Sequence, residues 1–129
     1  MADYNNSGVL QKKSYDFALR IINAYKYLIN QNEYVLSKQL LRSGTSIGAN
    51  CRESKNAQSS LDFISKLNIA LKEADETAYW LELLHDGKYI NEDVFLSIHA
   101  ECIELVKLLT KIIKTTKEKN INCQQPTKN

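Results

Sequence analysis

This 129-residue chain contains only two histidines and three cysteines, so it offers few nitrogen and sulfur ligands for a metal ion. The segment from Glu82 to His85 has the Glu-x-x-His spacing that some four-helix bundles use, in duplicate, to bind two iron ions. The other histidine, His99, has Leu96 three residues before it, so the second copy of the motif is missing. The sequence therefore predicts no metal site and no cofactor.

Nucleophilic and phosphate-binding motifs are also missing from the sequence. The segment from Gly44 to Gly48 lacks the lysine and the spacing of a phosphate-binding loop. The chain has an odd number of cysteines, Cys51, Cys102 and Cys123, and no two of them form a Cys-x-x-Cys pair. This pattern favours free thiols in a reducing cytoplasm. We therefore expect no enzyme and no small-molecule substrate, with Cys51 and Cys102 as small core residues.

A basic surface for phosphate groups is the better-supported chemistry. Residues 1–55 carry a net charge of +4, residues 56–106 of −7 and residues 107–129 of +5. In an up-and-down fold, one end would gather basic side chains, which attract nucleic-acid phosphates. The other end would gather the acidic residues Glu73, Asp75, Glu76, Glu82, Asp86, Glu92 and Asp93. The alternative is a solvated face set by helix dipoles, although Lys12 and Lys13 at a predicted helix start oppose the dipole. The candidate contacts are Lys12, Lys13, Arg52, Lys55, Lys66, Lys111, Lys114 and Lys117.

The elements that would position these side chains are helices, because apolar residues recur every three or four positions through most of the chain. Ser59 with Asp62 predicts the start of the third helix, Asn91 caps the fourth, and Gly87 is expected to be left-handed at a helix end. The predicted fold is all-α, one antiparallel up-down-up-down four-helix bundle. Its expected helices cover residues 9–30, 34–55, 60–86 and 91–118, with loose tails at 1–8 and 120–129.

Small residues crowd the stretch from Leu40 to Ser54. Composition alone would allow a loop here, because a glycine inside a helix costs about 1 kcal/mol relative to alanine. Gly44 and Gly48 are four residues apart, however, so on a helix they share one face, onto which a second helix could pack closely. A Gly→Ala substitution on this face would then be mild or stabilising. The predicted close-packing residues are Ser43, Gly44, Ile47, Gly48 and Cys51.

The string from Arg42 to Asn50, combined with the segment from Leu67 to Ala70, resembles a family of four-helix bundles encoded in intervening sequences of bacterial 23S rRNA genes. That family includes relatives of the accessory variability protein of diversity-generating retroelements. The resemblance covers roughly residues 17–109. It implies a homopentameric ring and, in the retroelement relatives, support of a reverse transcriptase and its structured template RNA.

Surplus apolar residues on the third helix are consistent with such self-association. The predicted oligomer interface consists of Ile69, Tyr79, Trp80 and Leu83. No apolar stretch has the length of a membrane span, so no membrane partner is expected. The predicted function is non-enzymatic binding of structured RNA by an oligomer, and the alternative is a protein–protein scaffold that binds no nucleic acid.

Overall fold

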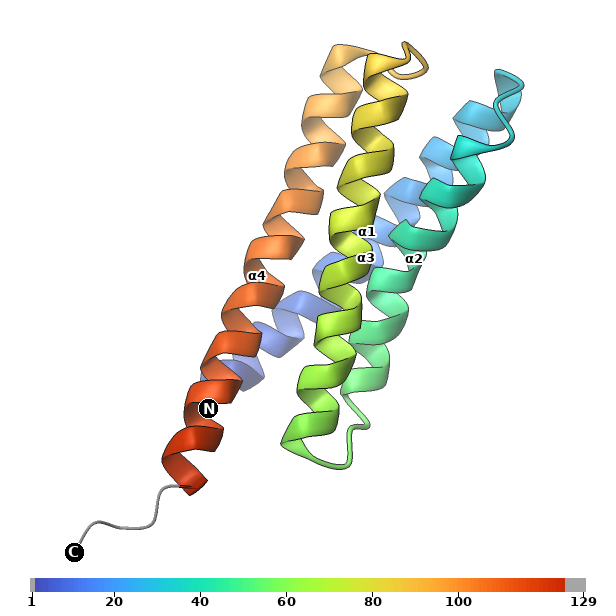
Figure 1. The fold of residues 1–129 in the computed structure, drawn as a ribbon. Coiled ribbons are helices and arrows are strands. Elements are labelled where there is room, and N and C mark those ends of the chain that lie inside the picture. The colour runs from blue at the N-terminus through green and yellow to red at the C-terminus, as the bar shows by residue number, and fades with distance from the viewer. Residues whose placement is uncertain (1, 125–129) are drawn as a thin grey trace, which may run out of the picture.

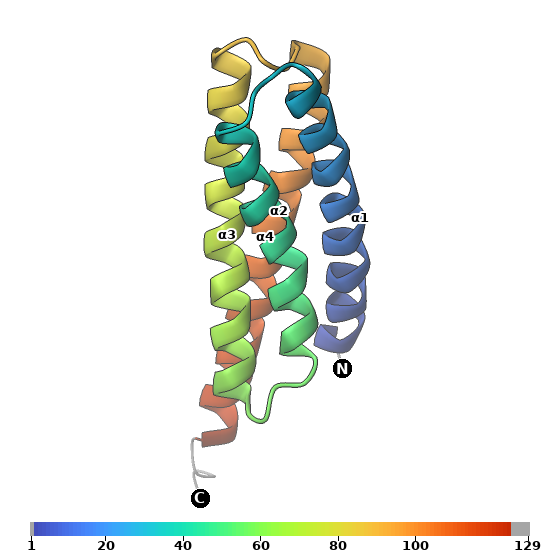
Figure 2. The same cartoon turned by 90° about the vertical axis from the view of Figure 1, so that its right-hand side faces the viewer.

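The computed structural model describes residues 2–124, with side chains for residues 7–121. It contains four helices, α1 (Ala2–Asn30), α2 (Leu36–Ser54), α3 (Ser60–Asp86) and α4 (Glu92–Gln124). Each helix packs antiparallel to the next and α4 returns to α1 (Figure 1 and Figure 2). This confirms the predicted all-α four-helix bundle. Within the described part of the chain, no helix is both long and apolar enough to cross a membrane.

The two ends of the bundle differ in what they contain. The α2–α3 end holds the connection between α2 and α3, the start of α1 and the last turns of α4 (Figure 2). The opposite α3–α4 end holds the α1–α2 and α3–α4 connections. The inward-facing seams of α3 and α4 fill the core between the ends; their buried members are Leu67, Ala70, Ala74, Thr77, Leu81, Leu84, Ile98, Cys102, Leu105, Leu109 and Ile112.

The outer helices are longer than predicted. The low helix propensity of Asn5, Asn6 and Gly8 favoured a loose start, but no proline interrupts the segment and α1 already begins at Ala2. Lys12 and Lys13 are therefore about 15 Å along the helix and not at its start. The helix dipole falls off within the first turn, so it exerts no constraint on these two lysines. α4 continues to Gln124, and residues 125–129 of the predicted tail lie outside the described residues.

Helix caps follow the sequence in two places and differ in one. The side chain of Ser59 accepts a hydrogen bond of 3.0 Å from the N–H of Asp62, which fixes the start of α3. Asn91 caps α4 by accepting a 2.9 Å bond from the N–H of Val94. Gly87 was expected to be left-handed, but its φ is −78°, and the left-handed residue is Lys88, with φ of 69°. The chain reverses one residue later than predicted.

The N-terminus of α2 is capped by Glu33, a residue that the sequence pattern did not single out. Its carboxylate accepts bonds of 3.2, 3.0 and 2.5 Å from the N–H groups of Val35, Leu36 and Ser37. Glu33 is buried, and burial alone would raise its pKa, but these N–H groups outweigh that effect and lower the pKa below the usual value of 4.5. The cap depends on the ionised carboxylate.

The small-residue stretch lies in α2 and forms its contact with α1, so the loop alternative is wrong. A Cβ atom at Gly44 would lie 2.7 Å from Cγ1 of Ile21, and one at Gly48 would lie 3.3 Å from the carbonyl oxygen of Ser14. Real Cβ atoms essentially never show the first distance. The expectation that alanine is mild is therefore wrong at Gly44, because an added methyl group there must displace Ile21.

Gly44→Ala should lower the free energy of unfolding by about 1–3 kcal/mol, the usual cost of overpacking a core contact. Gly8→Ala is the matched control, because nothing lies within 4 Å of its Cβ position and alanine favours α1. The control should be neutral or stabilising by up to about 1 kcal/mol. Urea denaturation of both variants measures the difference, and equal stabilities would contradict the close contact.

Glu33→Gln should destabilise the protein by about 1–2 kcal/mol at pH 7, because hydrogen bonds to a charged acceptor are replaced by weaker ones. The folded pKa is lowered, so the stabilisation is present above the unfolded pKa near 4.5 and disappears as pH falls through the folded value. The gap between parent and variant should therefore shrink toward pH 3. Glu118→Gln, at an exposed position, controls for loss of charge; a gap that stays constant with pH would exclude the ionic cap.

Candidate nucleic-acid interface

The outward face of α4 carries the longest run of exposed basic residues. Lys107, Lys111, Lys114 and Lys117 are exposed, and within the described residues none of them forms an ion pair or hydrogen bond through its side chain. No acidic residue occurs between Leu105 and Lys117. Their spacing of four, three and three residues puts them on one side of the helix over about 15 Å. We call these four residues the α4 lysine face.

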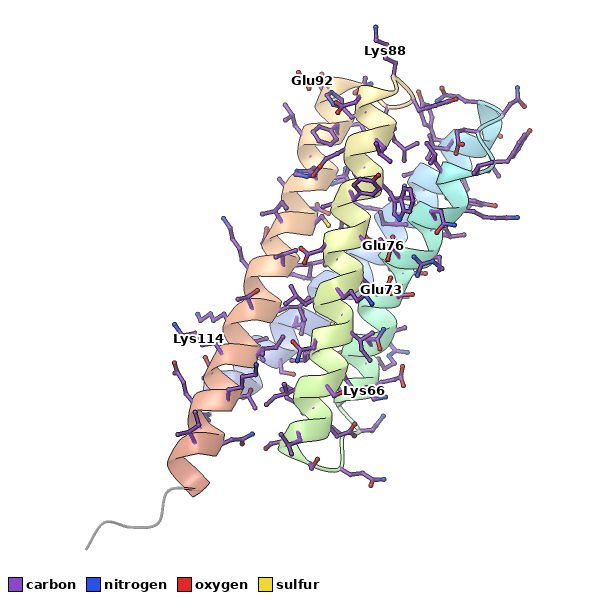
Figure 3. All side chains as sticks on the ribbon, viewed as in Figure 1. Lys66, Glu73, Glu76, Lys88, Glu92 and Lys114 are labelled. Atoms are coloured by element: carbon purple, nitrogen blue, oxygen red, sulfur yellow. The ribbon has the colours of Figure 1, made fainter. Side chains whose placement is uncertain are left out.

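Two further predicted basic residues lie at the same end of the bundle but on another corner. Arg52 and Lys55 are at the end of α2, exposed and without an ion-pair partner in residues 2–124. α2 contacts α1 and α3 and not α4 within the described fold, so the two basic groups occupy diagonal corners. Lys66 lies between them on α3, with its amino group 3.6 Å from Glu53 (Figure 3).

The sequence placed Lys12 and Lys13 in this basic group, but in the structure each of them is paired with an acidic side chain. The amino group of Lys12 lies 3.0 Å from Asp16 on the same helix. Lys13 forms an ion pair with Glu104 of α4, and this hydrogen bond raises the pKa of Lys13. The structure therefore assigns Lys13 to helix packing between α1 and α4.

The predicted acidic end of the bundle is also less concentrated than expected. Glu73 and Glu76 lie midway along α3, and both pair with Arg42 of α2 (Figure 3). The α3–α4 end also carries the exposed Lys88, in the connection between α3 and α4 (Figure 3). Four of the predicted acids, Glu82, Asp86, Glu92 and Asp93, do lie at that end, in the last turns of α3 and the first turn of α4. The predicted charge separation is therefore partial there.

Both histidines stack against Phe95 between α3 and α4. Ring centroids are 4.2 Å apart for His85 and Phe95, and 4.8 Å apart for Phe95 and His99. Nε2 of His85 lies 2.8 Å from Glu92, and Nε2 of His99 lies 2.9 Å from Glu82. Each ring thus has its own carboxylate and is separated from the other by Phe95. In residues 2–124, no three His, Cys, Asp or Glu side chains are grouped as metal ligands.

Cys51 and Cys102 are buried free thiols, as expected for core residues. Burial raises the pKa of Cys51 to about 11 and that of Cys102 to about 12. A thiol acts as a nucleophile through its thiolate. Both residues are therefore protonated at neutral pH and fill space in the core.

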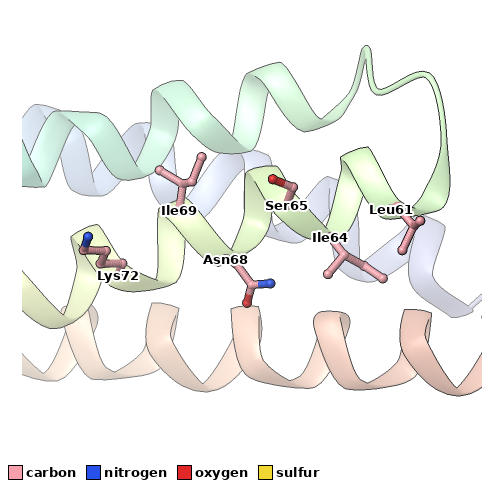
Figure 4. A pocket seen from close by; sticks show the side chains of 6 residues that line it. All are labelled: Leu61, Ile64, Ser65, Asn68, Ile69 and Lys72. Carbon is pink, nitrogen blue, oxygen red and sulfur yellow. The ribbon is translucent and has the colours of Figure 1, made fainter.

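The structure divides the predicted oligomer interface into two parts. Tyr79 is 54% exposed and packs edge-on against Trp80, with ring centroids 5.2 Å apart, while Leu83 follows one turn later. We call these three residues the α3 knob. Ile69 lies about 15 Å away along α3. It borders a separate hollow of about 430 Å³ on the outward face of α3 (Figure 4), lined by Leu61, Ile64, Ser65, Asn68, Ile69 and Lys72.

A second hollow, between α1 and α4, was not anticipated from the sequence. It has a volume of about 300 Å³. At its edge the side chain of Arg20 reaches from α1 to α4, and its Nη1 atom lies 3.0 Å from Oγ of Ser97 and 2.9 Å from Oε1 of Glu101. Long charged side chains thus bridge α1 and α4, whereas small residues form the contact between α1 and α2. We call this the α1–α4 hollow; its lining residues are Arg20, Asn23, Ala24, Tyr27, Ile90, Asn91, Val94 and Ile98.

Lys107 is the basic residue that sequence reasoning missed. It lies at the boundary between the acidic and basic segments of the chain, one helical turn before Lys111. Its spacing from Lys111 and Lys114 matches i, i+4 and i+7, which puts the three on one helix face. That spacing was visible in the sequence.

Comparison with known proteins identifies the family. A crystal structure at 1.70 Å of a protein of unknown function, from the S23 ribosomal protein family of Bacteroides thetaiotaomicron, is 58% identical in sequence. The match covers 84% of this chain and 98% of that one, with a TM-score of 0.83. No curated protein matches the chain. The family model of the 23S rRNA-intervening sequence protein matches residues 8–111, and the chain therefore belongs to this family.

Proposed function

We propose that this protein binds structured RNA through the α4 lysine face and has no catalytic activity. The observation that carries the proposal is the presence of four exposed lysines on one helix face, without an acidic residue among them. A lysine that already has a carboxylate partner must lose it to bind phosphate, whereas these four need only release counterions. Arg52 and Lys55 add charge at the same end of the bundle.

The surroundings of the lysine face favour contact with phosphates over contact with bases. α4 carries no Phe, Tyr or Trp after Phe95, so the helix that carries the lysines offers no such ring on which an unpaired base could stack. A rigid helix with lysines over about 15 Å suits the regular backbone of an RNA duplex. The RNA class that fits is therefore double-stranded and recognised by shape.

Self-association is the second part of the proposal. The α3 knob leaves apolar surface exposed, which supports contact with another copy of the chain. The family resemblance favours five copies, and a ring of five would repeat the lysine face five times. Weak phosphate contacts on several copies would then add through multivalency. The role in the cytoplasm beside a reverse transcriptase, implied by the retroelement relatives, remains a prediction.

Reversing Lys111, Lys114 and Lys117 to Glu should weaken binding of a hairpin RNA of about 20 base pairs by tenfold or more at low salt. Each phosphate contact adds about −0.7 to −0.9 to the slope of log affinity against log salt. Four contacts give a slope of about −3, so parent affinity should fall about 60-fold between 50 and 200 mM KCl. The variant should show a much shallower slope in fluorescence anisotropy titrations.

The matched control reverses Lys26, Lys38 and Lys88, which are exposed near the opposite end of the bundle and change net charge by the same amount. This control should keep most of the affinity and the steep slope. Equal affinities for parent and α4 variant would exclude RNA binding by this face and favour the protein scaffold. Equal losses in both variants would show that net charge, and not the α4 lysine face, drives binding.

A further inference from the structure

We infer that the α3 knob of one copy inserts into the α1–α4 hollow of a second copy. This inference rests on the proposed self-association and is independent of RNA binding. The two surfaces lie on different sides of one molecule, because α1 and α3 occupy diagonal corners of the bundle (Figure 2). An interface between two different patches is head-to-tail, so each copy uses its knob on one neighbour and its hollow on the other.

The knob and the hollow lie at the same height along the bundle. Sγ of Cys102 lies 3.2 Å from the carbonyl oxygen of Ala74, which fixes the register of α4 against α3. The knob, residues 79–83, follows Ala74 by five to nine residues, and residues 93–97 precede Cys102 by the same number. Val94 of the hollow is therefore level with the knob, and the bond from Arg20 to Ser97 brings α1 to that height as well.

Equal height matters because it determines how the assembly closes. A head-to-tail contact with no shift along the bundle axis relates neighbours by rotation alone. Such contacts form a ring when the rotation is a whole fraction of a full turn, whereas a shift along the axis gives an open helical filament. A ring whose bundles run parallel to its axis requires each copy to carry two complementary patches at the same height. The structure thus supports a closed assembly without fixing the number of copies.

The chemistry of the two surfaces is also complementary. The hollow has an apolar wall that includes Ala24, Val94 and Ile98, and its volume of about 300 Å³ equals the lower bound of typical ligand pockets. Tyr79 has an apolar ring and a hydroxyl group with no hydrogen-bond partner in the described residues. A tyrosine hydroxyl needs a partner once buried, and the amide groups of Asn23 and Asn91 border the hollow.

Tyr79→Glu should raise the concentration at which the oligomer half-dissociates by tenfold or more, because a buried aromatic residue in a pocket typically dominates interface energy. Tyr15→Glu is the matched control, since Tyr15 is 56% exposed but lies outside both surfaces. It should leave the dissociation unchanged. Sedimentation velocity measures both variants, and circular dichroism checks that they keep their helices. Equal dissociation of the two variants would overturn the inference.

Disulfide trapping tests the pairing directly. One variant carries Leu83→Cys on the knob and another carries Asn23→Cys at the hollow, each with Cys123→Ser, while the buried Cys51 and Cys102 stay in place. After mixing and oxidation, the pair should give a two-chain product that neither variant forms alone. A single chain with both cysteines should form a ladder that ends at the number of copies in the ring.

The possible outcomes distinguish failure of the knob-in-hollow contact from failure of the proposed self-association. A parent protein that sediments as a monomer would overturn both self-association and the knob-in-hollow contact. An oligomer that gives no mixed product would overturn only the contact. Efficient crosslinking of Leu83→Cys with itself would also overturn it, because that result requires two knobs to face each other across a two-fold axis.

Discussion

The close approach of α1 to α2 at Gly44 and Gly48 is the constraint on which the rest of this bundle depends. Without side chains at these positions, Ile21 and the backbone at Ser14 lie directly on α2. On the side of α1 that faces α4, the long charged side chains of Arg20 and the Lys13–Glu104 pair bridge the two helices. The α1–α4 hollow lies on this side of α1, and the close contact with the glycines lies on the side that faces α2.

The division of α4 into two faces follows from the same arrangement. Its inner seam, from Ile98 to Ile112, is fully buried, so the helix is anchored along its length and its outer face is free to carry charge. Four lysines on one face repel one another, and a helix anchored less firmly would be destabilised by them. The α4 lysine face therefore depends on the core of α3 and α4 behind it, and the rigid helix keeps the lysines in register.

Sequence reasoning predicted the fold because the helices are specified by local, repeated signals. The seam of α3, its Ser59 cap and the Asn91 cap of α4 can each be recognised within a few residues. What could not be predicted depends on side chains that reach across the fold. Lys13 looks like a free cation in the sequence, and only the register of α1 against α4 shows that Glu104 neutralises it. Glu33 is a different case, because its cap is local: the carboxylate accepts from N–H groups two to four residues later, but glutamate is not one of the usual capping residues.

The candidate site was harder to predict than the fold for a related reason. Basic residues at one end of a bundle can be counted from sequence, but whether they are available depends on acidic neighbours from other helices. The structure separates the candidates on this basis: α4 meets no acid between residues 105 and 117, whereas α1 faces Glu101 and Glu104. The lysine face lies toward the α2–α3 end, and the knob and hollow lie toward the other end. Because the lysine face is separated along the bundle from the knob and the hollow, the proposed assembly through the knob and the hollow would leave the lysines of every copy exposed.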